Sequence, residues 1–205
     1  MKVTLFGATG ATGSIMTKLL LDEGHEVTAY VRNPSKITQE HPRLKVIKGD
    51  IYDRGAIGKI LVGQKAVISC LGSNTTKESD QLTRMAENIS VAMKEAQVKR
   101  IVYMATAGIE NEFRGIFKVF IRLILGRVMD DHQGAATIYK SAGFDYTIIR
   151  PMQLKDGEAT GNYEIAKTGL PKSRKPVTRA DVAAFMVKAV KDNRYIKTSV
   201  AIAGK

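Results

Sequence analysis

Short apolar runs alternate with amphipathic stretches along the first half of the chain. The apolar runs predict β-strands at residues 2–6, 26–31, 44–48, 66–71 and 100–104. The amphipathic stretches predict helices at residues 12–23, 54–62 and 78–96. Strands that are apolar throughout are typical of a parallel sheet covered by helices on both faces. The pattern therefore predicts an α/β fold with a doubly wound parallel sheet.

The second half of the chain has a less regular pattern. We expect one helical region at residues 113–142, interrupted near Gly126 and again near Gly134, because glycine weakens a helix interior. A strand at residues 145–149 follows and stops at Pro151, and residues 157–169 are typical of a loop and a hairpin. Thr178 and Asp181 resemble a capping box. This box predicts a helix at residues 179–191, before a last strand at residues 198–203.

The long helical region contains an apolar block at residues 116–125, interrupted by Lys118 and Arg122. The block is well short of the roughly 20 apolar residues that a membrane-spanning helix needs. We therefore expect no membrane partner and assign the block to core packing, with a dimer face or a wall over a ligand as alternatives. The chain is expected to be a monomer or a weak homodimer.

The length and composition suit one domain, because 205 residues with 44% hydrophobic and 25% charged are too few for two ordinary ones. We expect a single domain over residues 1–205, with a small substrate-side region within residues 151–180. Cys70 has no cysteine partner, and three histidines form no cluster with metal-ligand spacing, so we expect no disulfide and no metal. Gly7 interrupts the first apolar run too early for a signal peptide, and we expect a cytoplasmic protein.

A glycine-rich loop follows the first predicted strand directly and opens the first predicted helix. In this context the glycine spacing indicates the dinucleotide-binding loop of a Rossmann-type sheet. Gly7 allows a tight turn, Gly10 lets the backbone approach a pyrophosphate, and Gly13 lets helix and strand pack closely. The helix N-terminus offers its N–H groups to the phosphates. The predicted phosphate-binding residues are Gly7, Thr9, Gly10, Ala11, Thr12 and Gly13. The alternative is a glycine-rich turn that holds no ligand.

The end of the second predicted strand indicates which dinucleotide is bound. A protein specific for NAD is expected to place Asp or Glu there for the ribose 2′-hydroxyl. This chain instead has Arg32, Ser35 and Lys36, and no acidic residue, at that position. A guanidinium, a hydroxyl and an ammonium all suit a 2′-phosphate, so we expect NADP, with NADPH preferred to NADH. The alternative is that these residues are solvated loop charges.

Two further strand ends carry candidate cofactor contacts, at the edge where ligands bind in open α/β sheets. Asp50 follows the third predicted strand and precedes Ile51. Its carboxylate is interpreted either as an acceptor for the adenine amino group or as a turn or capping aspartate. Leu71, Gly72 and Ser73 come at the end of the fourth predicted strand, where glycine lets the backbone pass close to the adenine ribose.

These motifs resemble the atypical short-chain dehydrogenase/reductase family of the NmrA-like, NAD(P)-binding kind, over nearly the whole chain. The widely shared motifs are the loop GATGATG at residues 7–13, Val31-Arg32, Gly49-Asp50 and Leu71-Gly72. The later motifs are closer to the biliverdin-IXβ reductase (flavin reductase) branch of that family. They are Asp130-Asp131-His132, SAGFDY at residues 141–146, Pro151, TGNY at residues 160–163, and VTRAD at residues 177–181.

The resemblance implies that Thr106, Pro151 and Met152 lie beside the nicotinamide, with Thr106 where the family commonly carries a serine. Two residues depart from the flavin reductase pattern. Gln153 stands in place of a histidine, and Arg150 in place of an apolar residue. Because of these departures, the resemblance does not identify the electron acceptor.

Thr106 and His132 are the candidate catalytic residues. The Thr106 hydroxyl is interpreted as a hydrogen-bond partner of the carboxamide or the acceptor, or else as a cap on a turn. His132 is interpreted as a proton relay or substrate contact, or else as a packed helix residue. Tyr163 and Lys167 have the spacing of a helical Tyr-x-x-x-Lys dyad. Four residues of a hairpin strand span roughly 13 Å, so we expect these two side chains to form no dyad.

The resemblance and the loop together predict an NADPH-dependent oxidoreductase that transfers hydride to a flavin, quinone, tetrapyrrole or similar conjugated acceptor. Such acceptors take their proton from solvent, so a precisely placed acid is not required. The alternative is a non-catalytic NmrA-like sensor whose bound NADP controls a protein partner. The net charge of +12 also admits an anionic membrane surface, a polyanionic small molecule, or nucleic acid bound through the basic residues 167–179. Because no aromatic residues alternate with these charges, we do not expect nucleic-acid binding.

Overall fold

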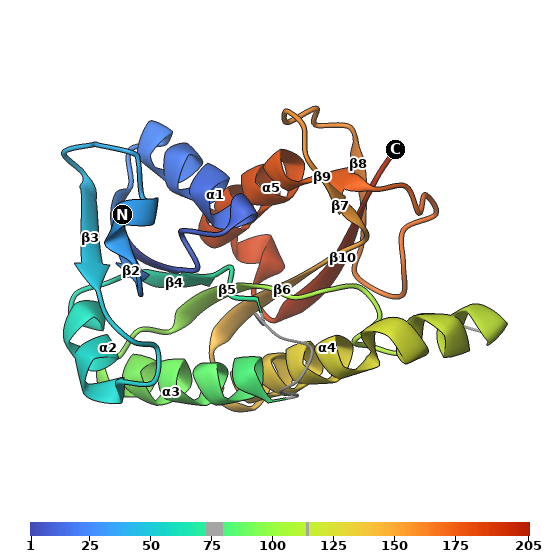
Figure 1. Ribbon diagram of the computed structural model, residues 1–205, viewed down its shortest axis with the longest axis horizontal. Coiled ribbons are helices and arrows are strands. Elements are labelled where there is room, and N and C mark those ends of the chain that lie inside the picture. The colour runs from blue at the N-terminus through green and yellow to red at the C-terminus, as the bar shows by residue number, and fades with distance from the viewer. Residues whose placement is uncertain (73–79, 114) are drawn as a thin grey trace.

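The computed structural model describes residues 1–72, 80–113 and 115–205. An eight-stranded sheet crosses the molecule in the order β3-β2-β1-β4-β5-β6-β10-β8 (Figure 1). Its strands are β1 (Lys2–Phe6), β2 (Glu26–Val31), β3 (Leu44–Lys48), β4 (Ala66–Ser69), β5 (Arg100–Met104), β6 (Asp145–Pro151), β8 (Tyr163–Ala166) and β10 (Thr198–Gly204). All neighbouring strands are parallel except β8, which runs antiparallel to β10. The order reverses between β1 and β4, and the predicted Rossmann-type fold is confirmed.

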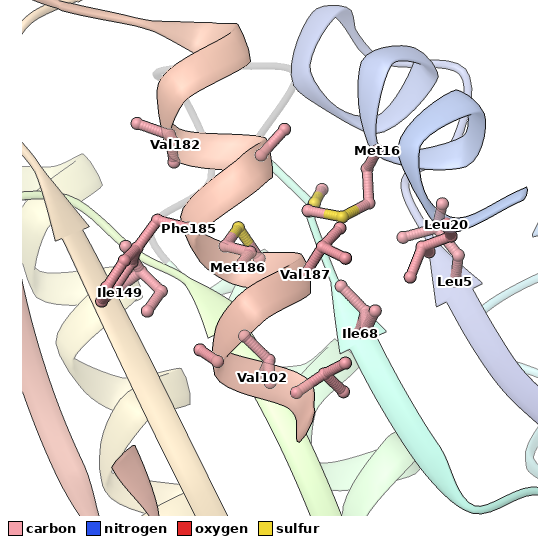
Figure 2. Close-up of a cluster of buried hydrophobic side chains, with 14 of the residues drawn as sticks. Leu5, Met16, Leu20, Ile68, Val102, Ile149, Val182, Phe185, Met186 and Val187 are labelled. Atoms are coloured by element: carbon pink, nitrogen blue, oxygen red, sulfur yellow. The ribbon is translucent and has the colours of Figure 1, made fainter. Parts of the chain in front are cut away.

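Helices cover both faces of the sheet, as predicted. Figure 1 shows α1 (Ala11–Asp22) and α5 (Arg179–Lys191) on one face, with α2 (Arg54–Leu61), α3 (Gln81–Glu95) and α4 (Gly115–Ser141) on the other. Each face has its own apolar cluster. In Figure 2, Met16 of α1 and Phe185 and Met186 of α5 pack over Ile68 of β4 and Ile149 of β6. Because every central strand is buried on both faces, the sheet is a rigid platform for the loops at its edges.

Three helices have side-chain caps at their N-termini. Asp53 accepts a hydrogen bond from the backbone of α2, and Thr178 accepts one from the backbone of α5, as the capping-box motif predicts. The cap of α3 comes from another helix, because the Asp131 carboxylate on α4 accepts from the N–H groups of Leu82 and Thr83, each at 2.9 Å. This contact ties α4 to the start of α3.

The predicted interruptions of the long helix are wrong, because α4 is one continuous helix from Gly115 to Ser141. A Cβ atom added at Gly134 would lie 2.2 Å from the Thr83 hydroxyl oxygen. Gly134 therefore marks a close approach of α3 to α4 and not a break. At Gly126 a Cβ atom would meet only the Cβ of Arg122, at 3.9 Å.

Two expectations for the C-terminal third are also corrected. Residues 157–169 form no hairpin, because β8 pairs with β10 at the edge of the main sheet. Pro151 is the last residue of β6 and is included in its pairing with β10. A separate two-stranded parallel sheet joins β7 (Leu154–Lys155) to β9 (Val177–Thr178). Short 3-10 helices lie at Pro34–Lys36 and Asn193–Tyr195.

The apolar block at residues 116–125 was assigned to core packing, and the structure contradicts this assignment. Ile121 packs partly against the core, whereas most of the other described apolar side chains point to solvent. The exposed members are Ile116, Val119, Phe120, Leu123, Ile124 and Leu125, at 43–89% exposure. Core packing therefore does not account for the block.

Candidate functional site

A cavity of about 140 Å³ lies at the carboxyl ends of β1, β2 and β4, where the strand order reverses. Seven predicted cofactor residues line it, namely Gly7, Thr9, Gly10, Arg32, Ile51, Leu71 and Gly72. The remaining lining residues are Val31 and Gly49, which belong to the motifs noted in the sequence, and Phe6, Tyr30, Cys70 and Met85, which were not predicted. Ser73 lies outside the described residues. The glycine loop and the ends of β1, β2, β3 and β4 thus meet at one hollow.

The glycine loop has the backbone geometry that requires glycine. Gly7 has a φ of +82°, and a Cβ atom there would lie 2.5 Å from the Cys70 carbonyl oxygen. A Cβ atom at Gly13 would lie 2.0 Å from the Gly7 carbonyl oxygen. The loop therefore turns tightly against β4, and α1 packs closely on the strand that precedes it.

The N-terminus of α1 is the part of this loop that suits a phosphate. Its N-cap is Gly10, no side chain in the described part of the chain accepts from its first N–H groups, and its first turn contains no acidic residue. The starts of α2, α3 and α5 each have a carboxylate or hydroxyl as acceptor. Free N–H groups and an unneutralised dipole favour an anion, and Gly10 leaves the approach open. The loop therefore fits a dinucleotide pyrophosphate.

A cation stands at the end of β2, beside this loop. Arg32 is exposed and lines the cavity. The Ser35 hydroxyl donates to the Asn33 side-chain oxygen at 2.7 Å, and Lys36 is exposed in the following 3-10 helix; neither lines the cavity. The strand end thus presents positive charge and no carboxylate to the cavity.

Asp50 stabilises the turn after β3, which was one of its two interpretations. Its carboxylate accepts from the Tyr52 N–H at 3.0 Å, and its carbonyl oxygen accepts from the Tyr30 hydroxyl at 3.1 Å. Burial, with Asp53 and Asp50 nearby, raises the pKa of Tyr30, so the phenol is neutral. Tyr30 and the buried Ile51 form part of the cavity wall. Tyr30 was not predicted, because β2 is buried on both faces and no alternation marks which of its side chains faces the cavity.

Thr106, Pro151 and Met152 lie at the same edge, beyond β4. The N–H of Ala105 donates to the Ile149 carbonyl at 2.8 Å, and the N–H of Ala107 donates to the Pro151 carbonyl at 2.9 Å. Thr106 is therefore held between two bonds to β6, and its side chain is half-buried. Pro151 is buried and Met152 is half-buried. These three residues do not line the cavity, nor do Ala11, Thr12 and Gly13, which lie in the first turn of α1.

His132 is packed beneath the sheet and paired with a tyrosine. Its Nδ1 atom lies 2.6 Å from the Tyr103 hydroxyl, and 8% of the residue is exposed. Burial lowers the pKa of His132 from 6.5 to about 4, against the opposing effect of Asp131. The imidazole is therefore neutral at physiological pH. A role for His132 or Thr106 in chemistry stays a prediction.

The buried imidazole predicts a loss of stability in mild acid. Between about pH 6.5 and pH 4 the unfolded chain binds more protons at this residue than the folded chain. Its contribution is therefore complete above pH 6.5 and is lost as the pH falls. We expect the free energy of unfolding, measured in urea by circular dichroism, to fall by about 2–3 kcal/mol between pH 7 and pH 4.5 through this group.

The variant His132→Gln should have a flatter pH profile than the wild type, because glutamine does not titrate. A matched change at the half-exposed His41, His41→Gln, should keep the wild-type profile. Equal pH dependence in wild type and His132→Gln would contradict the assignment.

Tyr163 and Lys167 do not form a catalytic dyad. Tyr163 lies on β8 and packs edge-on against Phe185, with ring centroids 6.0 Å apart. The Lys167 ammonium lies 5.9 Å above the Tyr195 ring. The two side chains therefore contact different partners, as the expected strand geometry implies.

Arg150 forms a buried ionic network behind the loop that carries Thr106. Its guanidinium contacts the Glu112 carboxylate and lies 3.2 Å from Glu110, and its Nε donates to the Ser199 hydroxyl at 2.9 Å. The Arg150 side chain is 0% exposed and that of Glu112 is 2% exposed. Burial lowers the pKa of Arg150, and Glu110 opposes this. The network ties the loop after β5 to β6 and β10.

A larger hollow of about 570 Å³ lies at the opposite edge of the sheet. It is lined by the first residues of β1, β2 and β3, which are Lys2, Glu26 and Leu44, together with the end of α2. It contains no residue of the motifs described above. The hollow at the carboxyl edge is therefore the candidate site.

The model of the family described as NAD(P)H-binding matches residues 7–193. The chain belongs to the NAD(P)H-binding family. The match begins at the first glycine of the loop and includes every described lining residue of the cavity from Gly7 onward. The family is one of NAD(P)H-dependent oxidoreductases, and the resemblance found in the sequence is confirmed at this level.

Similar proteins include reductases and dehydrogenases. A (4-alkanoyl-5-oxo-2,5-dihydrofuran-3-yl)methyl phosphate reductase of Streptomyces griseus is 25% identical over 208 residues, which cover 98% of this chain and 67% of that protein. The chain spans 31–35% of the length of several other curated relatives, which it matches over about half of its own length.

Two solved structures share the fold over almost their whole length. The anaerobillin reductase ChuY of Escherichia coli O157:H7 has a TM-score of 0.85 at 21% identity, with 100% of this chain and 97% of that chain covered. A wide-type short-chain dehydrogenase/reductase of Veillonella parvula in complex with NADP has a TM-score of 0.81 at 21% identity, with 98% and 94% covered. At these identities the likeness is one of fold.

Proposed function

We propose that the protein is an NADPH-dependent reductase that transfers hydride to a flavin, quinone, tetrapyrrole or similar conjugated acceptor. The observation that carries this proposal is a single cavity that joins the uncapped start of α1 to Arg32, with no carboxylate at the end of β2. The N–H groups of α1 suit a pyrophosphate, and the guanidinium suits a 2′-phosphate. The Veillonella parvula structure with NADP supports the choice of dinucleotide.

The proposed binding residues follow the strand ends. The glycine loop and the first turn of α1 hold the pyrophosphate. Arg32, with Ser35 and Lys36, holds the 2′-phosphate. The adenosine is bordered by Ile51, Leu71 and Gly72. Asp50 is proposed to lie beside the adenine in addition to its contact within the turn. NADPH supplies the hydride when bound. Thr106, Pro151 and Met152 are proposed to position the nicotinamide and acceptor rings and to keep water from them.

The separate contacts of Tyr163 and Lys167, which form no Tyr-Lys dyad, support the proposed acceptor class. A conjugated ring system takes its proton from solvent, so this site needs to orient two flat molecules more than it needs a strong acid. The ChuY protein, described as an anaerobillin reductase, and the Streptomyces griseus reductase support a reductase activity.

The test of activity is a steady-state assay of NADPH oxidation with FMN, quinones and biliverdin as separate acceptors. Saturable oxidation with at least one acceptor is expected. Tight NADPH binding without oxidation by any acceptor would instead support the nucleotide sensor. Failure to bind NADPH would overturn both.

The coenzyme preference is tested separately by Arg32→Asp. A charge-assisted hydrogen bond contributes about 1.5–3 kcal/mol, so the variant should bind NADPH about 10- to 100-fold more weakly. Binding of NADH should change by less than about 3-fold, because NADH has no 2′-phosphate. Both affinities are measured by fluorescence titration.

The control is Lys65→Asp, which makes the same change in charge on an exposed residue at the amino edge of β4. It should leave both affinities unchanged. Equal losses of NADPH and NADH binding in Arg32→Asp would refute the assignment of the 2′-phosphate.

A further inference from the structure

The first half of α4 carries an apolar surface that the core does not cover. Ile116, Val119, Phe120, Leu123 and Ile124 recur at the spacing of one helix face, and we call these five residues the α4 stripe. Their exposures are 89%, 58%, 58%, 80% and 60%. Figure 1 shows this end of α4 extending away from the rest of the molecule. Exposed apolar side chains gathered on one helix face indicate an interaction surface.

The charges around the stripe are of one sign. Residues 113–129 contain four basic residues and no acidic residue, and the whole chain has a net charge of +12. Lys118 and Arg122 lie on the face of α4 opposite the stripe, where they border a small hollow with Phe113 and Met129. Arg122 also pairs with Asp130 at 2.9 Å. A helix with an apolar face, basic residues on its opposite face and no acidic residue is complementary to an anionic lipid surface.

A second copy of the chain suits the α4 stripe less well than an anionic lipid surface does. A stable protein interface involves about 20–30 residues per partner, whereas the stripe has five. Two copies joined through their stripes would also bring two basic segments together, and the segment offers no acidic residue to neutralise them. Acidic headgroups neutralise these charges, and the acyl region accepts the apolar side chains.

We propose that the α4 stripe docks the protein on anionic lipid membranes, with α4 parallel to the membrane plane. The stripe lies among the acyl chains near the headgroups, and the basic residues on the opposite face of α4 lie toward the aqueous side, where they are attracted to the acidic headgroups. No helix in the described part of the chain has the length and apolar composition to span a membrane. A helix that lies on the membrane surface does not need to span the bilayer. The shortness of the apolar block therefore does not exclude surface docking. The proposal is independent of the proposed reductase activity.

The test is co-sedimentation of the full chain with vesicles of phosphatidylcholine, with and without phosphatidylglycerol. Binding to the anionic vesicles is expected to be at least about 10-fold stronger and to weaken at high salt, because salt screens the charges. The variant Leu123→Asp should lose at least about 10-fold in affinity, because it places a charge in the stripe. The variant Lys118→Gln should lose about 5-fold, the effect of about 1 kcal/mol per basic residue.

The matched control is Val62→Asp, a change at another apolar residue, 73% exposed just beyond α2. It should bind vesicles as the wild type does. Folding of every variant is checked by circular dichroism and thermal melting. Absence of binding to anionic vesicles, or equal binding by the wild type and Leu123→Asp, would overturn the proposal. A wild-type dimer that Leu123→Asp dissociates, without vesicle binding, would assign the stripe to a second copy and would overturn it too.

Discussion

Gly10→Val is expected to abolish the binding of both NADPH and NADH while leaving the protein folded. Gly10 has a φ of −80° and a ψ of 164°, which valine adopts readily. A Cβ atom there would lie 3.3 Å from the Gly7 carbonyl oxygen, so a shift of a few tenths of an ångström accommodates it. The added methyl groups then stand in front of the uncapped N–H groups of α1. They block the approach of a pyrophosphate.

The expected loss is large because several phosphate contacts disappear together. Three charge-assisted hydrogen bonds at about 1.5 kcal/mol each correspond to about 1000-fold in affinity. Isothermal titration calorimetry measures the affinity for each nucleotide, and circular dichroism measures folding. The control is Gly55→Val, at an exposed position on α2 where a Cβ atom lies 3.6 Å from its nearest neighbour, Asp53. If Gly10→Val retained NADPH affinity, the pyrophosphate would have to bind elsewhere.

Arg150→Met is expected to give the largest loss of stability. Methionine fills a similar apolar volume but leaves the Glu112 carboxylate, 2% exposed, without its cation. Removing one partner of a buried ion pair destabilises a protein by about 3–5 kcal/mol. In a chain of this length the loss corresponds to a fall in Tm of roughly 10 °C, measured by thermal melting.

The control for Arg150→Met removes an exposed ion pair instead. In Arg122→Met the lost partner is Asp130, and the two side chains are 41% and 51% exposed, so we expect a change below about 1 kcal/mol. Adding Glu112→Gln to Arg150→Met removes the unpaired charge and should restore part of the stability. Equal Tm values for Arg150→Met and Arg122→Met would contradict the role of the buried pair.

The fold and the glycine turn between β1 and α1 were predictable because the sequence signals for both come from residues close together in the chain. The bounds predicted for β1, β2, β3, β5 and α5 agree with those observed. An apolar strand, a glycine turn and a capping box each depend on neighbours within a few residues. The cavity likewise follows from strand ends and parallel order, and it is lined by Gly7, Gly10, Arg32 and Leu71, which were predicted as cofactor contacts.

Other features escaped sequence reasoning because they depend on residues distant in the chain. The interruption expected at Gly134 is absent because Thr83 of α3 packs there. The strand at residues 163–166 pairs with β10 and not with a local neighbour. His132 is neutral because Tyr103 and the core surround it, and nothing in its own helix indicates this.

The sequence alone determined the class of fold, the position of the glycine loop and the absence of a carboxylate at the end of β2. Hydrophobic periodicity, turn residues and charge depend on neighbouring residues, so they can be recognised in the sequence alone. Only the tertiary structure decided which side chains are buried together and which apolar residues have no cover. It paired Arg150 with Glu112 across 38 residues and left the α4 stripe exposed. Burial is the outcome of packing between distant segments, and no local pattern contains it.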